Sequence, residues 1–338
     1  MRAASASVVF CCALILWASA SISDEISPVG MRQLEFHDGD RDLSLTVYYP
    51  AAAASDADLF TMPFYTGIAL HRDAPLLGPQ AKRPLVMFSH GRGSNALAYA
   101  WFGQYLAARG FIVAALDHYR ANSYDATIAY LANKLWQRPK DVSLAITFLL
   151  QHRDFAPALD RGRVGIAGHS QGGFTALWAG GARVNGDKYL SFQQRWKDNR
   201  MVPAHLRRDL PLDPAPALDV HDPRIKAAFA MAPGTIQAFG MDEPGLGRMT
   251  IPAFLIVGAR DTQAAPGPNA VFAAMHIPRA TLEILPGLVD HEIFVNECND
   301  EGRDEFPEAC IDADGVDRAA LHRVIGEAAV SFFATTLK

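Results

Sequence analysis

The sequence GHSQGG at residues 168–173 constrains this chain most, because it follows the apolar segment 164–167 and precedes a segment suited to a helix. The pattern Gly-x-Ser-x-Gly is common by chance, but a strand before it and a helix after it are what a nucleophile elbow requires. Gly168 and Gly172 fit such a turn because neighbouring backbone would approach too closely for a β-carbon. Ser170 is therefore the first candidate nucleophile, and an ordinary glycine-rich loop is the alternative.

The composition is that of a globular protein. The chain has 338 residues, of which 50% are hydrophobic and 20% charged, so it can bury a large core. Its formal net charge is −5, and no run of Lys or Arg stands out. Nucleic acid and an anionic membrane surface are therefore not expected partners.

The N-terminus is typical of an export signal. Arg2 precedes the apolar segment 8–17, and small residues at 18–20 provide a cleavage site after Ala20. We expect residues 1–20 to be a signal peptide and 21–338 a single domain in the periplasm or outside the cell. Retention of the segment as a membrane anchor is the alternative, but the segment is short for a transmembrane helix.

Export changes the interpretation of the four cysteines. Cys11 and Cys12 lie in the expected signal, which leaves Cys298 and Cys310 as a pair in an oxidising compartment. A disulfide between them would contribute ~3 kcal/mol by closing its loop and would hold the otherwise loose acidic segment 299–309. Free thiols and metal ligation are the alternatives, but no second Cys/His pair stands at zinc spacing.

The remaining sequence indicates no metal or cofactor. Residues 312–315 resemble part of a calcium loop, but the full ligand spacing is missing. We therefore expect catalysis by side chains and backbone amides alone.

The rest of the chain alternates strands and helices. This alternation predicts an α/β fold with a mostly parallel central sheet and helices on both of its faces. Expected strands are 31–36 and 43–49 as an antiparallel hairpin, then 84–89, 111–116, 164–167, 225–231, 253–257 and 281–285; expected helices are 140–151, 174–179 and 317–337.

Two insertions interrupt this alternation. Residues 51–83 contain Pro and aromatic residues, and the sequence does not indicate their shape. Residues 183–222 are polar and Pro-rich, with Trp196 and a basic pair at Arg207 and Arg208. We interpret the second insertion as a lid rather than a separate domain.

A serine nucleophile needs a histidine base and an acid that orients it. His291 follows the last expected strand and precedes the final helix, and Asp261 directly follows the strand 253–257. Both positions lie where the carboxyl ends of parallel strands meet, in the chain order Ser, Asp, His. His169 and His90 are better placed for packing, and Asp242 and Asp290 are the rival acids.

Two backbone amides are expected to form an oxyanion hole. The Gln171 amide follows the nucleophile, and the Arg92 amide lies in the glycine-rich turn after the strand 84–89. Five aromatic residues flank these motifs, and core packing is favoured for them over lining a substrate pocket. They are Trp101, Phe102, Tyr119, Phe174 and Trp178.

These motifs resemble the α/β-hydrolase fold, and within it the dienelactone hydrolases and the platelet-activating-factor acetylhydrolases. The resemblance extends from about residue 83 to the C-terminus. It depends on FSHGRG at 88–93, Asp117-His118, RPKDV at 138–142, GHSQGG at 168–173, Asp261 and His291. It implies a hydrolase of this fold.

The expected activity is hydrolysis of carboxylic esters by a secreted serine esterase. Dienelactone hydrolases carry a cysteine where this chain has Ser170, and acetylhydrolases carry their acid where it has Pro233 and Gly234. The ester therefore stays open, and short-chain, lipid and polyester substrates are all candidates. A peptidase or a noncatalytic binding protein on this fold is the alternative. The oligomeric state is not indicated.

Overall fold

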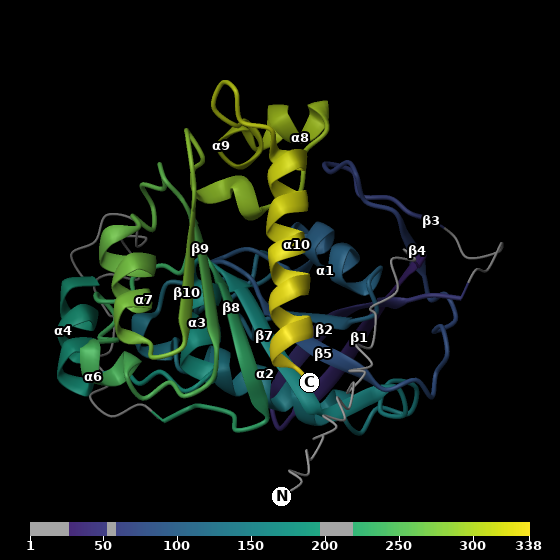
Figure 1. The fold of residues 1–338 in the computed structure, drawn as a ribbon, viewed down its shortest axis with the longest axis horizontal. Coiled ribbons are helices and arrows are strands. Elements are labelled where there is room, and N and C mark those ends of the chain that lie inside the picture. Colours follow the sequence, from purple (N-terminus) through teal and green to yellow (C-terminus); the bar gives the residue numbers. More distant parts are fainter. Residues whose placement is uncertain (1–26, 53–58, 197–218) are drawn as a thin grey trace, which may run out of the picture.

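The described residues of this computed structural model, 27–52, 59–196 and 219–338, build a ten-stranded mixed sheet with helices packed on both faces (Figure 1). The strand order is β10-β9-β8-β7-β5-β6-β2-β1-β4-β3. The strands from β10 to β6 are parallel to one another, whereas β2 joins β6 and β1 in antiparallel pairs. The predicted α/β architecture is confirmed.

Every helix and strand expected from the sequence is present, with ends shifted by a few residues. The strands are β1 (Val29–Asp38), β2 (Arg41–Pro50), β3 (Leu59–Phe60), β4 (Leu70–Arg72), β5 (Arg83–Ser89), β6 (Ile112–Asp117), β7 (Leu159–His169), β8 (Ile225–Met231), β9 (Ala253–Gly258) and β10 (Ala280–Leu285). The α-helices are α1 (Ala100–Ala107), α2 (Gln137–Leu149), α3 (Gln171–Ala179), α4 (Gly186–Trp196), α6 (Glu243–Leu246), α7 (Phe272–His276), α8 (Asp300–Glu305), α9 (Pro307–Cys310) and α10 (Arg318–Thr336). Shorter turns of other helix types are η1 (Ala96–Tyr99), η2 (Ala132–Lys134), η3 (Gly267–Val271) and η4 (His291–Phe294).

Helices α1 and α10 cover one face of the sheet, and α2 and α3 cover the other (Figure 1). On the α10 face, Phe229 of β8 packs against Phe333 of α10 and Phe102 of α1, with ring centroids 6.1 Å apart in both pairs. Helix α10 begins where the Asp317 carboxylate accepts a hydrogen bond from the Ala320 amide (2.9 Å). Aromatic packing thus fills the core between the sheet and these two helices.

The parallel register brings the carboxyl ends of the central strands together. Ser89 at the end of β5 pairs with Gly168 of β7, and His169 pairs with Met231 at the end of β8. Gly258 at the end of β9 pairs with Leu285 of β10. The loops that leave these strands therefore emerge at a single edge of the sheet, where ligands bind in open α/β folds.

The first insertion, residues 51–83, adds strands β4 and β3 to the edge of the sheet that lies farthest from β10. Strand β4 pairs with β1, and β3 pairs with β4, so this segment continues the hairpin whose turn has Gly39 at a φ of +64°. Of the second insertion, the structure describes 183–196 and 219–222, which include α4. Arg207, Arg208 and the expected signal at 1–20 lie outside the described residues, as does the side chain of Trp196.

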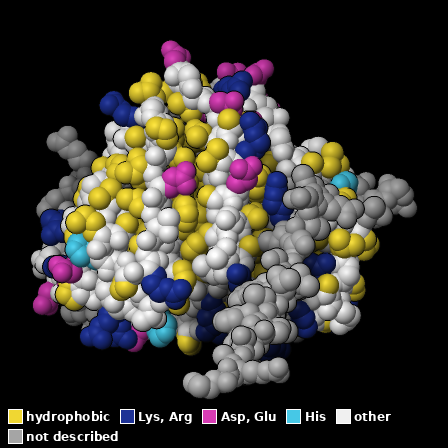
Figure 2. All heavy atoms as spheres, viewed as in Figure 1, with side chains coloured by type: hydrophobic (Ala, Val, Ile, Leu, Met, Phe, Trp, Pro, Cys, Tyr) yellow, Lys and Arg dark blue, Asp and Glu magenta, His cyan; other side chains and the backbone are white. Residues whose placement is uncertain are grey.

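The outer strands are less completely covered than the centre. Figure 2 shows hydrophobic side chains gathered over β9 and β10, beside α10. Ile284 of β10 is 43% exposed, whereas Phe254 of β9 packs on Phe332 of α10 with a centroid separation of 5.7 Å. Within the described ranges, no helix combines the length and the apolar character needed to cross a bilayer.

Candidate active site

Ser170 lies at the tight turn between β7 and α3. Its φ is +55° and its ψ is −117°, a backbone conformation that is strained for a residue with a side chain. A β-carbon on Gly172 would lie 1.8 Å from the Ser89 carbonyl oxygen, and one on Gly168 would lie 2.3 Å from the Gly172 carbonyl oxygen. Backbone packing therefore excludes any side chain at both glycines, as the elbow pattern predicted.

The end of β8 holds the serine from the other side. The Ser170 amide donates to the Met231 carbonyl (2.9 Å), and the Gly234 amide donates to the Ser170 carbonyl (3.1 Å). A β-carbon on Gly234 would lie 3.5 Å from the Ser170 hydroxyl oxygen. The loop after β8 thus contributes backbone to the site, and it places no carboxylate beside the serine.

His291 and Asp261 form a buried pair at the same sheet edge. His291 Nδ1 donates to the Asp261 carboxylate at 2.7 Å, and the two side chains are 5% and 0% exposed. The rival acids have other partners, because Asp290 caps η4 and Asp242 caps α6. The structure therefore brings Asp261 to His291, and His291 lines one cavity together with Ser170.

His169 contacts the backbone of His291 and the hydroxyl of Tyr99. Its Nε2 donates to the His291 carbonyl (3.0 Å), and its Nδ1 accepts from the Tyr99 hydroxyl (2.9 Å). The Tyr99 hydroxyl in turn accepts from the Gly91 amide (3.2 Å). Burial lowers the pKa of His169 well below its ordinary value, so the ring is neutral, as this donor–acceptor pattern requires.

The two expected oxyanion donors lie on either side of the serine. Gln171 begins α3, and Arg92 follows Gly91 in the turn after β5 and lines the cavity. A β-carbon on Gly91 would lie 3.6 Å from the Ser170 β-carbon, so this turn packs directly against the elbow. The Arg92 guanidinium lies 5.8 Å from the centre of the Tyr130 ring, and burial lowers its pKa.

Arg138 of α2 contacts both segments that carry these amides. Its guanidinium donates to the His90 carbonyl and to Ser89 Oγ, and its Nε donates to Thr175 Oγ1 at 3.2 Å. The Thr175 hydroxyl donates to the Gln171 carbonyl (2.8 Å). Burial lowers the pKa of Arg138 to about 9, which still leaves it charged at neutral pH. One buried cation thus holds the turn and the elbow together.

A second buried chain of hydrogen bonds connects this guanidinium to β6. His118 Nε2 accepts from the Ser89 hydroxyl (2.8 Å), and its Nδ1 donates to Asp141 (3.1 Å). Asp141 also accepts from Arg41 of β2, and burial raises its pKa to about 6 despite that partner. The segments 117–118 and 138–142 were identified from the sequence only as part of the family resemblance. The structure shows that they support the turn after β5.

The cavity above Ser170 has a volume of about 680 Å³, within the usual range for small-molecule sites. None of the five aromatic residues considered from the sequence lines it: Trp101, Phe102, Phe174 and Trp178 are core residues, and Tyr119 packs on Arg41. The described residues of the second insertion do not line it either. The aromatic residues that do line it are Phe60, Phe64, Tyr65, Tyr99, Tyr124 and Phe306.

Most of these aromatic residues were missed from the sequence because they lie in loops outside the alternating pattern. The clustering of Phe60, Phe64 and Tyr65 within six residues was the available signal in the first insertion. Phe306 lies between Cys298 and Cys310, which form the predicted disulfide with Cα atoms 5.5 Å apart. The segment 299–309, which this disulfide was predicted to hold, contains α8 and α9.

Comparisons with known proteins find one family of relatives. Residues 65–143, which include the turn after β5 and the start of α2, match the family model "Platelet-activating factor acetylhydrolase, isoform II". A platelet-activating factor acetylhydrolase from Canis lupus familiaris is 26% identical in an alignment of 276 residues. The match covers 59% of this chain and 59% of that one. One from Cavia porcellus is 32% identical over 136 residues, 28% of this chain and 31% of that one.

A solved structure confirms the architecture. A ferulic acid esterase from Streptomyces cinnamoneus superimposes with a TM-score of 0.63 at 21% identity, covering 94% of this chain and 92% of that one. The protein therefore has the α/β-hydrolase fold. Its resemblance to the platelet-activating factor acetylhydrolases is also confirmed, although the match spans 59% of the length of the canine relative.

Proposed function

We propose that this protein is a serine esterase that hydrolyses carboxylic esters through an acyl-enzyme on Ser170. The observation that carries the proposal is that His291, held by the buried Asp261 carboxylate, lines one cavity together with the strained Ser170. In this mechanism His291 takes the proton of the Ser170 hydroxyl as that oxygen attacks the ester carbonyl. The same histidine then protonates the leaving alcohol, and water releases the acyl group in a second cycle.

The other residues of the proposed mechanism orient His291 and stabilise the negative charge that develops on the substrate oxygen. Asp261 accepts a hydrogen bond from Nδ1 and so keeps Nε2 of His291 available as the base. The amides of Gln171 and Arg92 are proposed to donate to the oxyanion of the tetrahedral intermediate. Arg138 donates to the His90 carbonyl and, through the Thr175 hydroxyl, is linked to the Gln171 carbonyl, so it supports both segments that carry these amides.

The proposal extends to the location of the protein. We infer that residues 1–20 direct export and that the mature chain works in the periplasm or outside the cell. The Cys298–Cys310 disulfide supports this inference, because such bonds persist in oxidising compartments. Mass analysis of protein recovered from the periplasm or the medium would find a chain that begins at residue 21.

Substitution of the nucleophile tests the activity. Ser170→Ala is expected to lower the kcat for nitrophenyl esters by about 10⁴-fold or more, with an unchanged unfolding transition. Peptide anilides serve as the comparison substrates, and the wild-type protein is expected to cleave them far more slowly than esters. Ester hydrolysis that survives in Ser170→Ala would contradict the proposal.

A further inference from the structure

The outer side of the cavity is an aromatic wall built from two distant segments. Phe64 and Tyr65 come from the first insertion, and Phe306 comes from the loop between α8 and α9. The rings of Phe64 and Phe306 meet edge to face, with centroids 5.2 Å apart. Phe306 is nevertheless 48% exposed, so part of the ring is accessible although it lines the cavity. These three residues are called the aromatic wall below.

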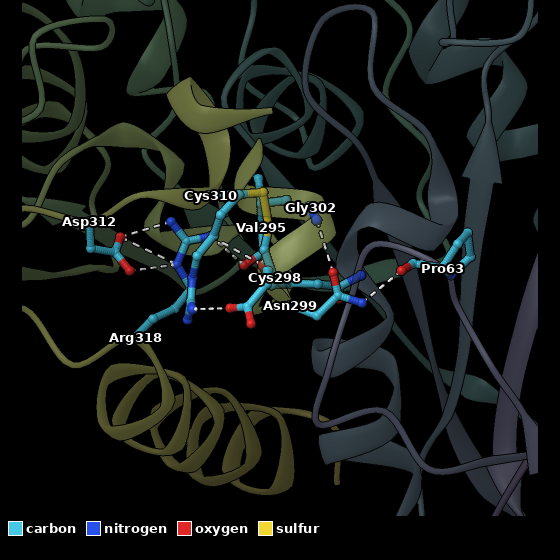
Figure 3. The surroundings of a disulfide bond; sticks show 11 residues. Pro63, Val295, Cys298, Asn299, Gly302, Cys310, Asp312 and Arg318 are labelled. Carbon is cyan, nitrogen blue, oxygen red and sulfur yellow. Dashed lines mark hydrogen bonds and ion pairs between the residues drawn. A yellow bond between two sulfur atoms is a disulfide. The ribbon is translucent and has the colours of Figure 1, made fainter. Parts of the chain in front are cut away.

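Backbone contacts join the two segments of the aromatic wall. Tyr65 forms an antiparallel bridge with Cys298, and the Asn299 amide donates to the Phe64 carbonyl (3.1 Å). The Asn299 side chain donates to the Pro63 carbonyl at 2.7 Å (Figure 3). A β-carbon on Gly302 would lie 2.3 Å from the Phe64 carbonyl oxygen, so the contact is close. The wall is therefore a defined surface rather than two independent loops.

The same segment is anchored at its base. The Cys298–Cys310 disulfide closes it, and Arg318 of α10 donates to Asp312 just outside the two cysteines (Figure 3). Arg318 also donates to the Asn296 carbonyl. Cys310 itself lines the cavity. The disulfide and the ion pair thus fix both ends of the segment that carries Phe306.

The charges near the wall favour a neutral ligand. The cavity is lined by one cation, Arg92, and one anion, Glu292, of which the latter accepts from the Gln263 side chain (2.9 Å). Glu292 is the one carboxylate in the described lining, and the Arg92 cation balances its charge. Exposed ring faces and edges in a site of this size bind another aromatic ring well, because offset and edge-to-face contacts add to the apolar area buried.

We propose that the aromatic wall binds an aromatic group of the substrate, so that the protein prefers aryl-bearing esters over small aliphatic ones. This inference depends on the esterase function proposed above. Phe306 and Phe64 are then specificity-determining residues, and the disulfide-closed segment supports their arrangement.

The test compares three neutral esters whose hydrolysis is followed by proton release. They are ethyl acetate, benzyl acetate with a ring on the alcohol side, and ethyl 3-phenylpropanoate with a ring on the acyl side. The wild type is expected to show a kcat/KM at least tenfold higher for one of the aryl esters than for ethyl acetate. Absence of any such preference, with ethyl acetate hydrolysed, would overturn this inference and leave the esterase function standing; no hydrolysis of any ester would contradict the esterase function itself.

Variants of the wall locate the preference. Phe306→Ala and Phe64→Ala are each expected to lower kcat/KM for the preferred aryl ester about tenfold, with ethyl acetate unchanged within twofold. Phe306→Leu, which keeps apolar bulk, is expected to lose most of the preference. The matched control is Ile311→Ala, because Ile311 is 59% exposed and does not line the cavity. A preference that survives all three wall variants would overturn the proposal.

Two further arms identify the ligand and the support. Acetylcholine carries a quaternary ammonium group, which aromatic rings also bind. A Phe306-dependent preference for acetylcholine over benzyl acetate would show that the wall binds a cationic group and not an aryl group.

Cys298→Ser/Cys310→Ser is expected to reduce the aryl preference severalfold while ethyl acetate turnover persists. Equal loss for both esters would show that the disulfide supports the whole site instead of the wall.

Discussion

The floor and the outer wall of the cavity are built in different ways. The floor comprises Ser170 and His291, which line the cavity, and Asp261, which is hydrogen-bonded to His291; these residues follow β7, β10 and β9 at one edge of the sheet. The aromatic wall (Phe64, Tyr65 and Phe306) stands on loops that a disulfide and a few backbone hydrogen bonds hold together. Under the proposed function, the sheet positions the chemistry and the loops select the substrate.

Burial separates the two regions as well. Solvent hardly reaches the side chains of His291 and Asp261 in the floor or that of His169 beside them. The Phe306 side chain of the wall is about half exposed. A change in the floor is therefore expected to affect all esters equally. A change in the wall is expected to alter the ratio between esters, and the following predictions use that difference.

Asp261→Asn is expected to have the largest effect. An amide cannot hold the Nδ1 proton of His291 as the carboxylate does, so kcat should fall about 10⁴-fold for aryl and aliphatic esters alike. Steady-state kinetics on ethyl acetate and benzyl acetate measure both values. Asp242→Asn is the matched control, since that carboxylate caps α6 and should leave kcat within twofold. A smaller loss for one ester class would contradict the assignment of Asp261 to the floor.

Two glycine substitutions contrast the regions directly. Gly172→Ala would drive a β-carbon into the Ser89 carbonyl, and we expect at least a 100-fold loss for every ester and about 3 kcal/mol lower stability. Gly302→Ala would meet the Phe64 carbonyl and should reduce the aryl preference about tenfold, with ethyl acetate unaffected. Gly267→Ala has open space around it and is the control. Identical ester profiles for the first two variants would remove the distinction between floor and wall.

Acid is expected to weaken the support beneath His291. His322 donates from Nε2 to the Ile293 carbonyl and stacks on Trp101, and burial lowers its pKa to about 3. Below about pH 6.5 the unfolded chain binds a proton at this residue that the folded chain does not, so stability falls as the pH falls. Between pH 7 and pH 5 this residue should account for about 2 kcal/mol.

Urea unfolding of the wild type and of His322→Gln at the two pH values measures this contribution. The variant is expected to lose about 2 kcal/mol less stability on acidification than the wild type. The same pH dependence in both proteins would mean that His322 does not couple protonation to unfolding.

The sequence predicted the floor far better than the wall. Ser170 lies in a motif whose glycines are required because a β-carbon would clash with nearby backbone. Asp261 and His291 follow apolar strands, and the parallel order of these strands brings both residues to one edge of the sheet. Phe64 and Phe306 lie in segments without hydrophobic periodicity, 242 positions apart, and no local pattern shows that they meet. Arg138 is an intermediate case. Its motif at 138–142 was visible in the sequence, but its contacts with the turn after β5 and with Thr175 of α3 depend on tertiary packing.

Reaction with a fluorophosphonate tests the central claim most directly, because only an activated serine is phosphonylated rapidly. Intact mass and peptide mapping are expected to find one adduct on Ser170, lost in Ser170→Ala and slowed strongly in Asp261→Asn. No adduct on the folded wild-type protein, or an adduct on a different residue, would contradict the proposed esterase mechanism.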